Sequence, residues 1–122
     1  NAYFHVLVDK LAEKMRLSHT EVHNMMIADW GRVDEELSNI IMDDEIPWEK
    51  VKAIHLRPTT HTQVLDNGKL YRVYLVMRGS HTYNSLEMAH LIDGTVQEAK
   101  KQGIETLPPQ ELERLKQTWD VK

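Results

Sequence analysis

One stretch, residues 69–103, most constrains the fold, because it predicts a strand, a polar loop and a helix in succession. Residues 70–77 are rich in the β-branched and aromatic types that favour a half-buried strand. Asn84 stands three residues before Glu87, the spacing of a capping box at a helix start, and Gly103 can adopt the left-handed conformation that ends a helix. The helix predicted over 85–102 must fold back on the strand through an apolar stripe: Met88, Ala89, Ile92, Val96 and Ala99.

Two further amphipathic helices are predicted at the start of the chain. The apolar stripe of the first recurs every three or four residues: Phe4, Leu7, Val8, Leu11, Ala12 and Met15. Ser18 and Glu21 repeat the capping-box spacing before the second helix, which Gly31 ends. Because the connection between them is very short, the two helices form a helical hairpin.

The strands are less evenly marked. Residues 32–45 fit either a helix or a strand, and we interpret them as a strand or an irregular segment. Pro47 can open a single helical turn, and a strand over 53–56 should stop before Pro58. Asn67-Gly68 predicts a hairpin with a two-residue turn, because these residues tolerate positive φ best. That turn places Val64 opposite Tyr71, Thr62 opposite Val73 and Thr60 opposite Leu75, on the side expected to face the core.

Together these patterns predict an α+β fold with an N-terminal helical hairpin, a small antiparallel sheet with a β-hairpin, a long amphipathic helix and a short C-terminal helix. The last helix follows Pro108-Pro109 and carries Leu112, Leu115 and Trp119. A length of 122 residues is that of one domain, so we expect a single domain over 1–122. The chain opens at Asn1 inside a predicted helix, so we expect further residues upstream. The chain has no cysteine and no apolar run that could span a bilayer, which predicts a cytoplasmic protein without membrane contact.

Charge is distributed unevenly along the chain. A net charge of −4 argues against a protein that holds nucleic acid by bulk electrostatics. Residues 29–49 hold eight acidic residues against Arg32 alone, whereas residues 50–78 hold six basic residues against Asp66 alone. This asymmetry permits a local anion-binding patch, and the acidic stretch from Asp34 to Glu49 could instead bind a protein.

The histidines suggest two kinds of chemistry, and neither pattern is complete. His19 and His23 stand at i and i+4, which can place two metal ligands on one helix face, but the sequence indicates no third ligand. A hairpin followed by a helix, with His61, Asn84 and His90, resembles a ββα-metal nuclease, but this chain has no acidic residue adjacent to His61 to complete such a site. There is no nucleophile elbow, phosphate-binding loop or dinucleotide fingerprint. We therefore predict no catalytic residue, no metal site and no cofactor.

The outer face of the hairpin is the better candidate for binding. Arg72 and Arg78 lie an even number of residues apart, so both should face the same side, with Tyr74 between them and His61 opposite. Cations for phosphates beside rings for bases are typical of nucleic-acid binding, although such a face can equally be solvated or form a dimer interface. The loop residues Ser80 and His81 at a helix start could add an anion site, and Lys100 and Lys101 are the alternative cations.

The sequence resembles a known family at both ends. Residues 78–88, from Arg78-Gly79-Ser80 through Asn84 to Met88, continued by 91–93 and by Gly103-Ile104, are similar to phage and prophage proteins of the Orf or NinB type. The opening residues 1–7 are similar to the segment that follows a Ser-x-x-Gln-Asn motif in that family, with Asn1 as its last residue. The likeness is loose over 32–64.

This resemblance implies a homodimeric, non-catalytic recombination mediator in the cytoplasm of a bacterial host. Such a protein binds single-stranded or gapped DNA, contacts the host single-strand binding protein and helps a recombinase to load. A metal-dependent nuclease acting on recombination intermediates and a purely protein-binding module are the alternatives. We also expect a dimer because the helices have more apolar surface than one small sheet can cover, the surplus being Met25, Met26, Trp30, Leu112, Leu115 and Trp119.

Overall fold

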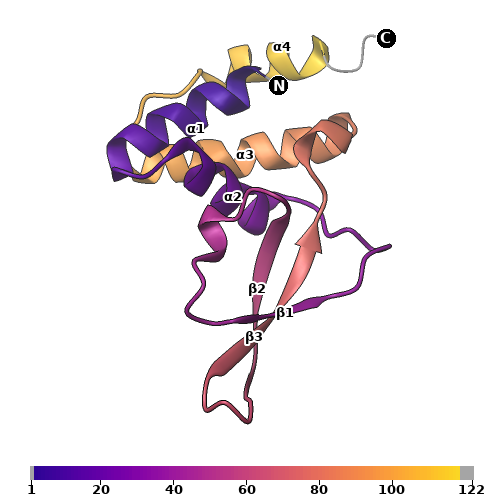
Figure 1. The fold of residues 1–122 in the computed structure, drawn as a ribbon. Helices are drawn as coiled ribbons and strands as arrows, with labels where there is room; N and C mark the ends of the chain where they lie inside the picture. Colours follow the sequence, from indigo (N-terminus) through magenta and orange to yellow (C-terminus); the bar gives the residue numbers. More distant parts are fainter. Residues whose placement is uncertain (1, 119–122) are drawn as a thin grey trace.

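The computed structural model of the chain describes residues 2–118 and has the predicted α+β architecture (Figure 1). Its helices are α1 (Ala2–Met15), α2 (His19–Trp30), α3 (Ser85–Lys101) and α4 (Pro109–Gln117). The strands are β1 (Ile40–Asp43), β2 (His55–Val64) and β3 (Leu70–Met77). Single 3₁₀ turns, η1 (Trp48–Lys50) and η2 (Ser80–Thr82), precede β2 and α3. The helices gather at one end, and the hairpin of β2 and β3 projects away from them.

Local signals set the helix ends where the sequence predicts them. Both capping boxes are present: the Ser18 side chain accepts the Glu21 N–H at the start of α2, and the Asn84 side chain accepts the Glu87 N–H at the start of α3. Gly103 has the left-handed φ of +74° that a helix end favours. Trp119, which we predicted in the last helix, lies outside the described residues, as does Asn1.

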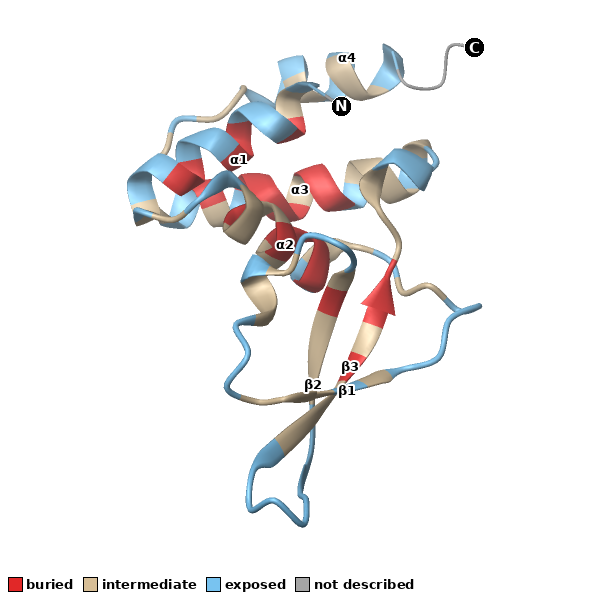
Figure 2. Ribbon diagram, viewed as in Figure 1, coloured by how far each residue is buried: buried red, intermediate tan, exposed pale blue. Residues whose placement is uncertain are grey.

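The main core lies between α1, α2, α3 and the end of β3. Its least exposed side chains are Phe4, Leu7, Val8, Leu11, Val22, Ile27, Leu91, Ile92 and Ala99. Figure 2 shows the buried positions gathered where the helices meet. Helix α3 buries more than the predicted stripe, since Leu91, Gly94 and Thr95 are buried as well. The reason is that α3 packs against both α1 and α2, so a wider part of its surface is covered.

The sheet has the order β1-β3-β2, and both pairs of strands are antiparallel. Residues 32–45 are irregular apart from β1 and one bridge between Val33 and Met77, as predicted. Strand β2 is longer than predicted and runs through Pro58. Proline is tolerated there because β2 is an edge strand and its pairing with β3 is interrupted between Pro58 and Thr62.

The predicted hairpin register is wrong by one residue. Val64 pairs with Leu70 and Thr62 with Arg72, because the Leu65 N–H donates to the Lys69 carbonyl and encloses a three-residue turn. Only Gly68 in that turn has a positive φ, +79°. A turn of three residues with glycine at the left-handed position is the second common hairpin type, and it moves every pair between the turn and the interruption by one place.

Candidate functional site

A groove with a volume of about 500 Å³ lies on the sheet face that carries Arg72 and Tyr74, and we call it the sheet groove. Its lining comes from the segment after β1, from η1 and from both hairpin strands, and consists of Asp44, Glu45, Ile46, Pro47, Trp48, Glu49, Pro58, Thr59, Thr60, Arg72 and Tyr74. The face chosen from the sequence is therefore hollowed. The residues that shape the hollow differ in part from those predicted.

Arg72 is held within the sheet groove by three hydrogen bonds. Its Nε donates to Oδ1 of Asp44 at 2.7 Å and its Nη2 to Oδ2 of Asp44 at 3.5 Å, while its Nη1 donates to the Thr59 carbonyl at 2.7 Å. The hydrogen bond to Arg72 lowers the pKa of Asp44 and raises the pKa of Arg72. The guanidinium is thus positioned, and the anion that it holds is a carboxylate of the same chain.

Acidic residues of the β1 segment pair with the basic residues of the hairpin. Besides Asp44 with Arg72, Asp43 lies 3.5 Å from the Lys69 ammonium. The charge asymmetry seen along the sequence is therefore partly cancelled in space, because the four-residue strand β1 lies beside β3. Partly exposed ion pairs of this kind contribute little to stability, so a competing anion can displace them at low cost.

The prediction that the Tyr74 ring is open for stacking is wrong. Tyr74 is 1% exposed, and it forms a second small core with Leu56 and Val76. Burial raises the pKa of its hydroxyl. The cover comes from Ile40, Met42 and Trp48, which pack against this cluster. Trp48 is only partly buried and lines the groove, so it offers the aromatic surface that was predicted for Tyr74.

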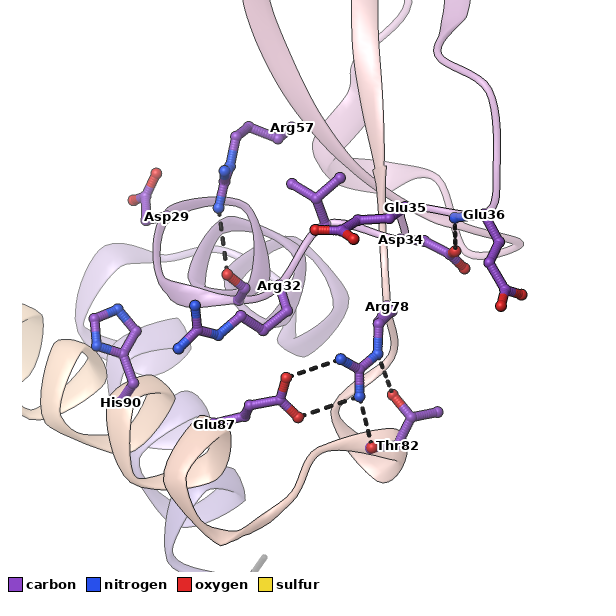
Figure 3. Close-up of a pocket in the computed structure, with 12 residues that line it drawn as sticks. Asp29, Arg32, Asp34, Glu35, Glu36, Arg57, Arg78, Thr82, Glu87 and His90 are labelled. Carbon is purple, nitrogen blue, oxygen red and sulfur yellow. Dashed lines mark hydrogen bonds and ion pairs between the residues drawn. The ribbon is translucent and has the colours of Figure 1, made fainter.

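Arg78 lies in a different and larger groove, of about 890 Å³, which we call the Arg78 groove (Figure 3). Its guanidinium donates from Nη1 to Oε2 of Glu87 at 2.8 Å and from Nη2 to Oε1 of Glu87 at 3.2 Å and to the Thr82 carbonyl at 2.7 Å. This hydrogen bonding lowers the pKa of Glu87. The prediction that Arg72 and Arg78 form one row is wrong, because β3 ends at Met77 and Arg78 turns toward α3.

The Arg78 groove holds two further arginines. Arg57 donates to the carbonyls of Ala28 and Gly31 at the end of α2, at 2.6 and 3.4 Å, which favours that negative helix end. Arg32 is exposed, and within residues 2–118 its guanidinium forms no hydrogen bond or ion pair. The lining also has five acidic residues, namely Asp29, Asp34, Glu35, Glu36 and Glu87. Carboxylates outnumber guanidiniums in both grooves, because Asp44, Glu45 and Glu49 line the sheet groove beside Arg72. The sheet groove is the better candidate for nucleic acid because the indole ring of Trp48 also lines it.

The remaining predicted site residues line neither groove. His61 is exposed where the pairing of β2 is interrupted. Ser80 and His81 form η2, and the amides that follow them are occupied: the Thr82 and Tyr83 N–H groups donate to the carbonyls of Gly79 and Ser80. Since Asn84 and Glu87 complete the capping box, this helix start has few free amides for an anion.

Lys100 and Lys101 are exposed in the last turn of α3, and Lys101 lies 3.4 Å from Glu98. Trp48 and Asp44, by contrast, were not predicted as site residues. The signal that could have indicated Trp48 is a tryptophan directly after Pro47 in an otherwise polar segment, where an aromatic side chain has little local apolar surface to pack on.

The residues of the nuclease hypothesis are not brought together. His61 lies on the projecting hairpin, His90 lies on α3 in the Arg78 groove, and Asn84 caps α3. Within residues 2–118, no group of three or more His, Cys, Asp or Glu side chains is arranged to hold a metal ion.

Comparison of the chain with protein-family models, with curated proteins and with solved structures finds no match. Among the helices of the described part of the chain, none is long and apolar enough to cross a membrane.

Proposed function

We propose that the chain is a non-catalytic DNA-binding accessory protein of phage-type recombination, and that a single DNA strand lies along the sheet groove. One observation carries this assignment: the positioned guanidinium of Arg72 and the partly buried ring of Trp48 line the same groove. Single strands are bound by this combination, since a cation holds the backbone phosphate while a base stacks on an aromatic ring. The resemblance over residues 78–104 supports the same class of function.

Binding requires an exchange of anions at Arg72. A phosphate that reaches the guanidinium takes the place of the Asp44 carboxylate, which now holds it at 2.7 Å. Both partners keep about a quarter of their side-chain surface exposed, 27% for Arg72 and 29% for Asp44, so the exchange takes place in contact with water. The overall charge of −4 limits the affinity, and strong binding should require low salt.

The test compares matched single-charge variants in a gel-shift series over single-stranded, gapped and duplex DNA. Arg72→Gln should weaken binding of all sequences alike and reduce the salt slope by roughly 0.7, the value for one phosphate contact on a single strand. Arg114→Gln, an equal charge change at an exposed residue of α4 outside the sheet groove, is the control and should leave both unchanged. Asp44→Asn removes the competing carboxylate and should strengthen binding.

Trp48→Leu tests the stacking step separately, because leucine still covers Tyr74 and offers no ring. It should weaken binding by about 1 to 3 kcal/mol without changing the salt slope. Equal effects of Arg72→Gln and Arg114→Gln would place the site elsewhere. If the wild-type protein retards no DNA at low salt, DNA binding is refuted and a protein-binding role of Asp34 to Glu49 is favoured. Cleavage of DNA in magnesium or manganese that is lost on changing His61 or His90 would establish the nuclease instead.

The proposed partners are the host single-strand binding protein, a recombinase and a second copy of the chain. The residues expected to drive dimerisation are largely used inside the chain: Met26 is 3% exposed, and Met25, Trp30 and Leu112 pack against the main core. Trp119 lies outside the described residues. The most exposed large apolar side chains are instead Leu86 in the first turn of α3, Ile41 on β1 and Val64 near the hairpin tip, which are 79%, 64% and 63% exposed. Sedimentation of Leu86→Ser, Ile41→Ser and Val64→Ser variants therefore tests dimerisation better than changes at the residues predicted from the sequence.

A further inference from the structure

Four histidines from three elements lie side by side where the helical hairpin meets the sheet, and we call them the histidine row. The ring centroids of His5, His19 and His23 form a nearly equilateral triangle with sides of 5.6, 5.8 and 5.9 Å. His55 on β2 extends the group, with its ring centroid 5.3 Å from that of His23. His23 therefore lies at the centre and also contacts the Phe4 ring.

Hydrogen bonds connect the histidine row to the segment that carries Trp48. Asn24, which is 3% exposed, donates from its amide nitrogen to the carbonyls of Glu49 and Val51 at 2.8 and 2.7 Å. Its amide oxygen lies 2.9 Å from Nδ1 of His55. Since both amide protons go to carbonyls, that oxygen accepts, and Nδ1 of His55 carries the proton. Asn24 thus ties η1 to α2 and to His55.

Negative charge near the histidine row is scarce. From α1, Asp9 lies 2.6 Å from Nδ1 of His19 and is the carboxylate that faces the row. From α2, Glu21 is engaged in the capping box. The η1 segment contributes the two backbone carbonyls bound by Asn24, and η2 contributes His81, another potential cation that acts on His55. A proton added to His5, His23 or His55 therefore meets other imidazoles. Asp9 favours a proton on His5, but within residues 2–118 none of these three histidines forms an ion pair with a carboxylate.

Three of the four imidazoles, those of His5, His23 and His55, therefore have a lowered pKa, which favours their neutral form. Burial, and then the neighbouring His55, His5 and His19, lower the pKa of His23 from 6.5 to about 4. Burial also lowers the pKa of His5 and the pKa of His55, and His81 adds to the effect on His55. The group is not a metal site in this arrangement, because no three such side chains within residues 2–118 could hold an ion.

We propose that the histidine row is a proton-sensitive joint, which holds the η1 segment against the helical hairpin when its imidazoles are neutral and releases that segment when they gain protons. Chains in which these contacts are open bind more protons than the closed form between pH 6.5 and about 4. The closed form is therefore fully favoured above pH 6.5 and loses stability as the pH falls through that range. Since η1 positions Trp48, acid should also weaken the sheet groove; this last consequence rests on the proposed function.

The experiment follows the indole N–H resonance of Trp48 and the His23 ring protons by NMR between pH 7.5 and 4.5, together with the thermal unfolding midpoint. In the wild-type protein, lowering the pH should shift the Trp48 resonance as the histidine row gains protons, and it should lower the thermal unfolding midpoint. His23→Phe keeps an aromatic ring without a proton site, and His55→Gln keeps a donor for Asn24. Each should flatten both pH profiles between pH 6.5 and 5, whereas His61→Phe, at an exposed histidine outside the row, should leave them as in the wild type.

Equal pH profiles in the wild type, His23→Phe and His55→Gln would overturn the joint, as would a Trp48 resonance that does not move. Should His23→Phe fail to fold, the wild-type titration and His55→Gln still decide the question. DNA binding is measured separately at pH 7.5. If the proposed function is wrong, no DNA binding is seen at pH 7.5, while the pH profiles of Trp48 and of the unfolding midpoint still behave as the joint predicts. If the joint is wrong, DNA binds normally at pH 7.5 and its affinity is the same at pH 5.5.

Discussion

Replacing Gly94 by alanine tests the contact between α2 and α3 on which the rest of the fold is built. Gly94 is buried in α3, and a Cβ added to it would lie 2.0 Å from Cδ2 and 2.3 Å from Cγ of Trp30. These atoms belong to a rigid indole ring that packs against the main core and contacts the His90 ring edge to face at 5.9 Å. The ring therefore has little room to move away.

Two opposing effects set the size of the change. Alanine is favoured over glycine inside a helix by about 1 kcal/mol. Overpacking a well-filled contact costs typically about 1 to 3 kcal/mol, and a separation of 2.0 Å from a ring atom puts Gly94→Ala at or above the upper end. The clash should win, so we expect a net loss of about 2 kcal/mol and a fall in the unfolding midpoint of roughly 5 to 10 °C.

The assay is a double-mutant cycle by urea and thermal unfolding. Trp30→Leu removes the ring, so Gly94→Ala in that background should cost much less than in the wild type, or should stabilise through its helix preference. A coupling of at least about 1 kcal/mol between the two positions is expected. A Gly94→Ala variant that is more stable than the wild type, or whose effect is the same with and without the indole ring, would show that the Cβ does not clash with Trp30.

Two other stability changes follow from single residues. Asn24→Ala leaves two carbonyls without their donor and should lower the free energy of unfolding by about 2 to 4 kcal/mol in urea titrations, whereas a loss under 1 kcal/mol would show that water replaces the amide. Gly103→Ala forces alanine into a φ of +74° after α3, where a Cβ meets no atom, so backbone strain alone should cost about 1 kcal/mol by the same titration. A neutral Gly103→Ala would mean that the chain takes another helix end.

The parts of the fold that depend on near neighbours in sequence were predictable. Each capping box joins residues three apart, and α3 begins at Ser85 as expected and ends one residue before the predicted 102. The helical hairpin and the strand over 70–77 follow from patterns of similar range. The hairpin turn marks the limit of this reasoning: Asn67-Gly68 indicated its position, but whether Asp66 belongs to the turn decides the register, and both turn lengths suit the local residues.

The candidate site could be predicted only in part, because its contacts are distant in sequence. The alternation of side chains along a strand placed Arg72 on the correct face of the sheet. It gave no sign of the partner, because Asp44 is 28 residues away in the sequence. Tyr74 is covered by Trp48, which is 26 residues away in the sequence, and no pattern near residue 74 indicates that cover. From the sequence, the i and i+4 spacing of His19 and His23 indicated that these two histidines share one helix face. His5 and His55 lie beside them because of how α1 and β2 pack against α2, which the local sequence does not indicate.

The interruption of pairing between Pro58 and Thr62 divides the hairpin into two parts with different constraints. On the helix side, His55 to Pro58 are in register with Met77 to Tyr74 and are packed into the domain. On the far side, the β2 residues and the turn are exposed. The β3 residues opposite are constrained, because they pair with β1 and include Arg72. Selection can therefore lengthen, shorten or replace only the turn and the β2 residues that lead into it without disturbing the inner part. Related chains could diverge mostly in this outer part, and an experimenter could exchange it between them at the same boundary.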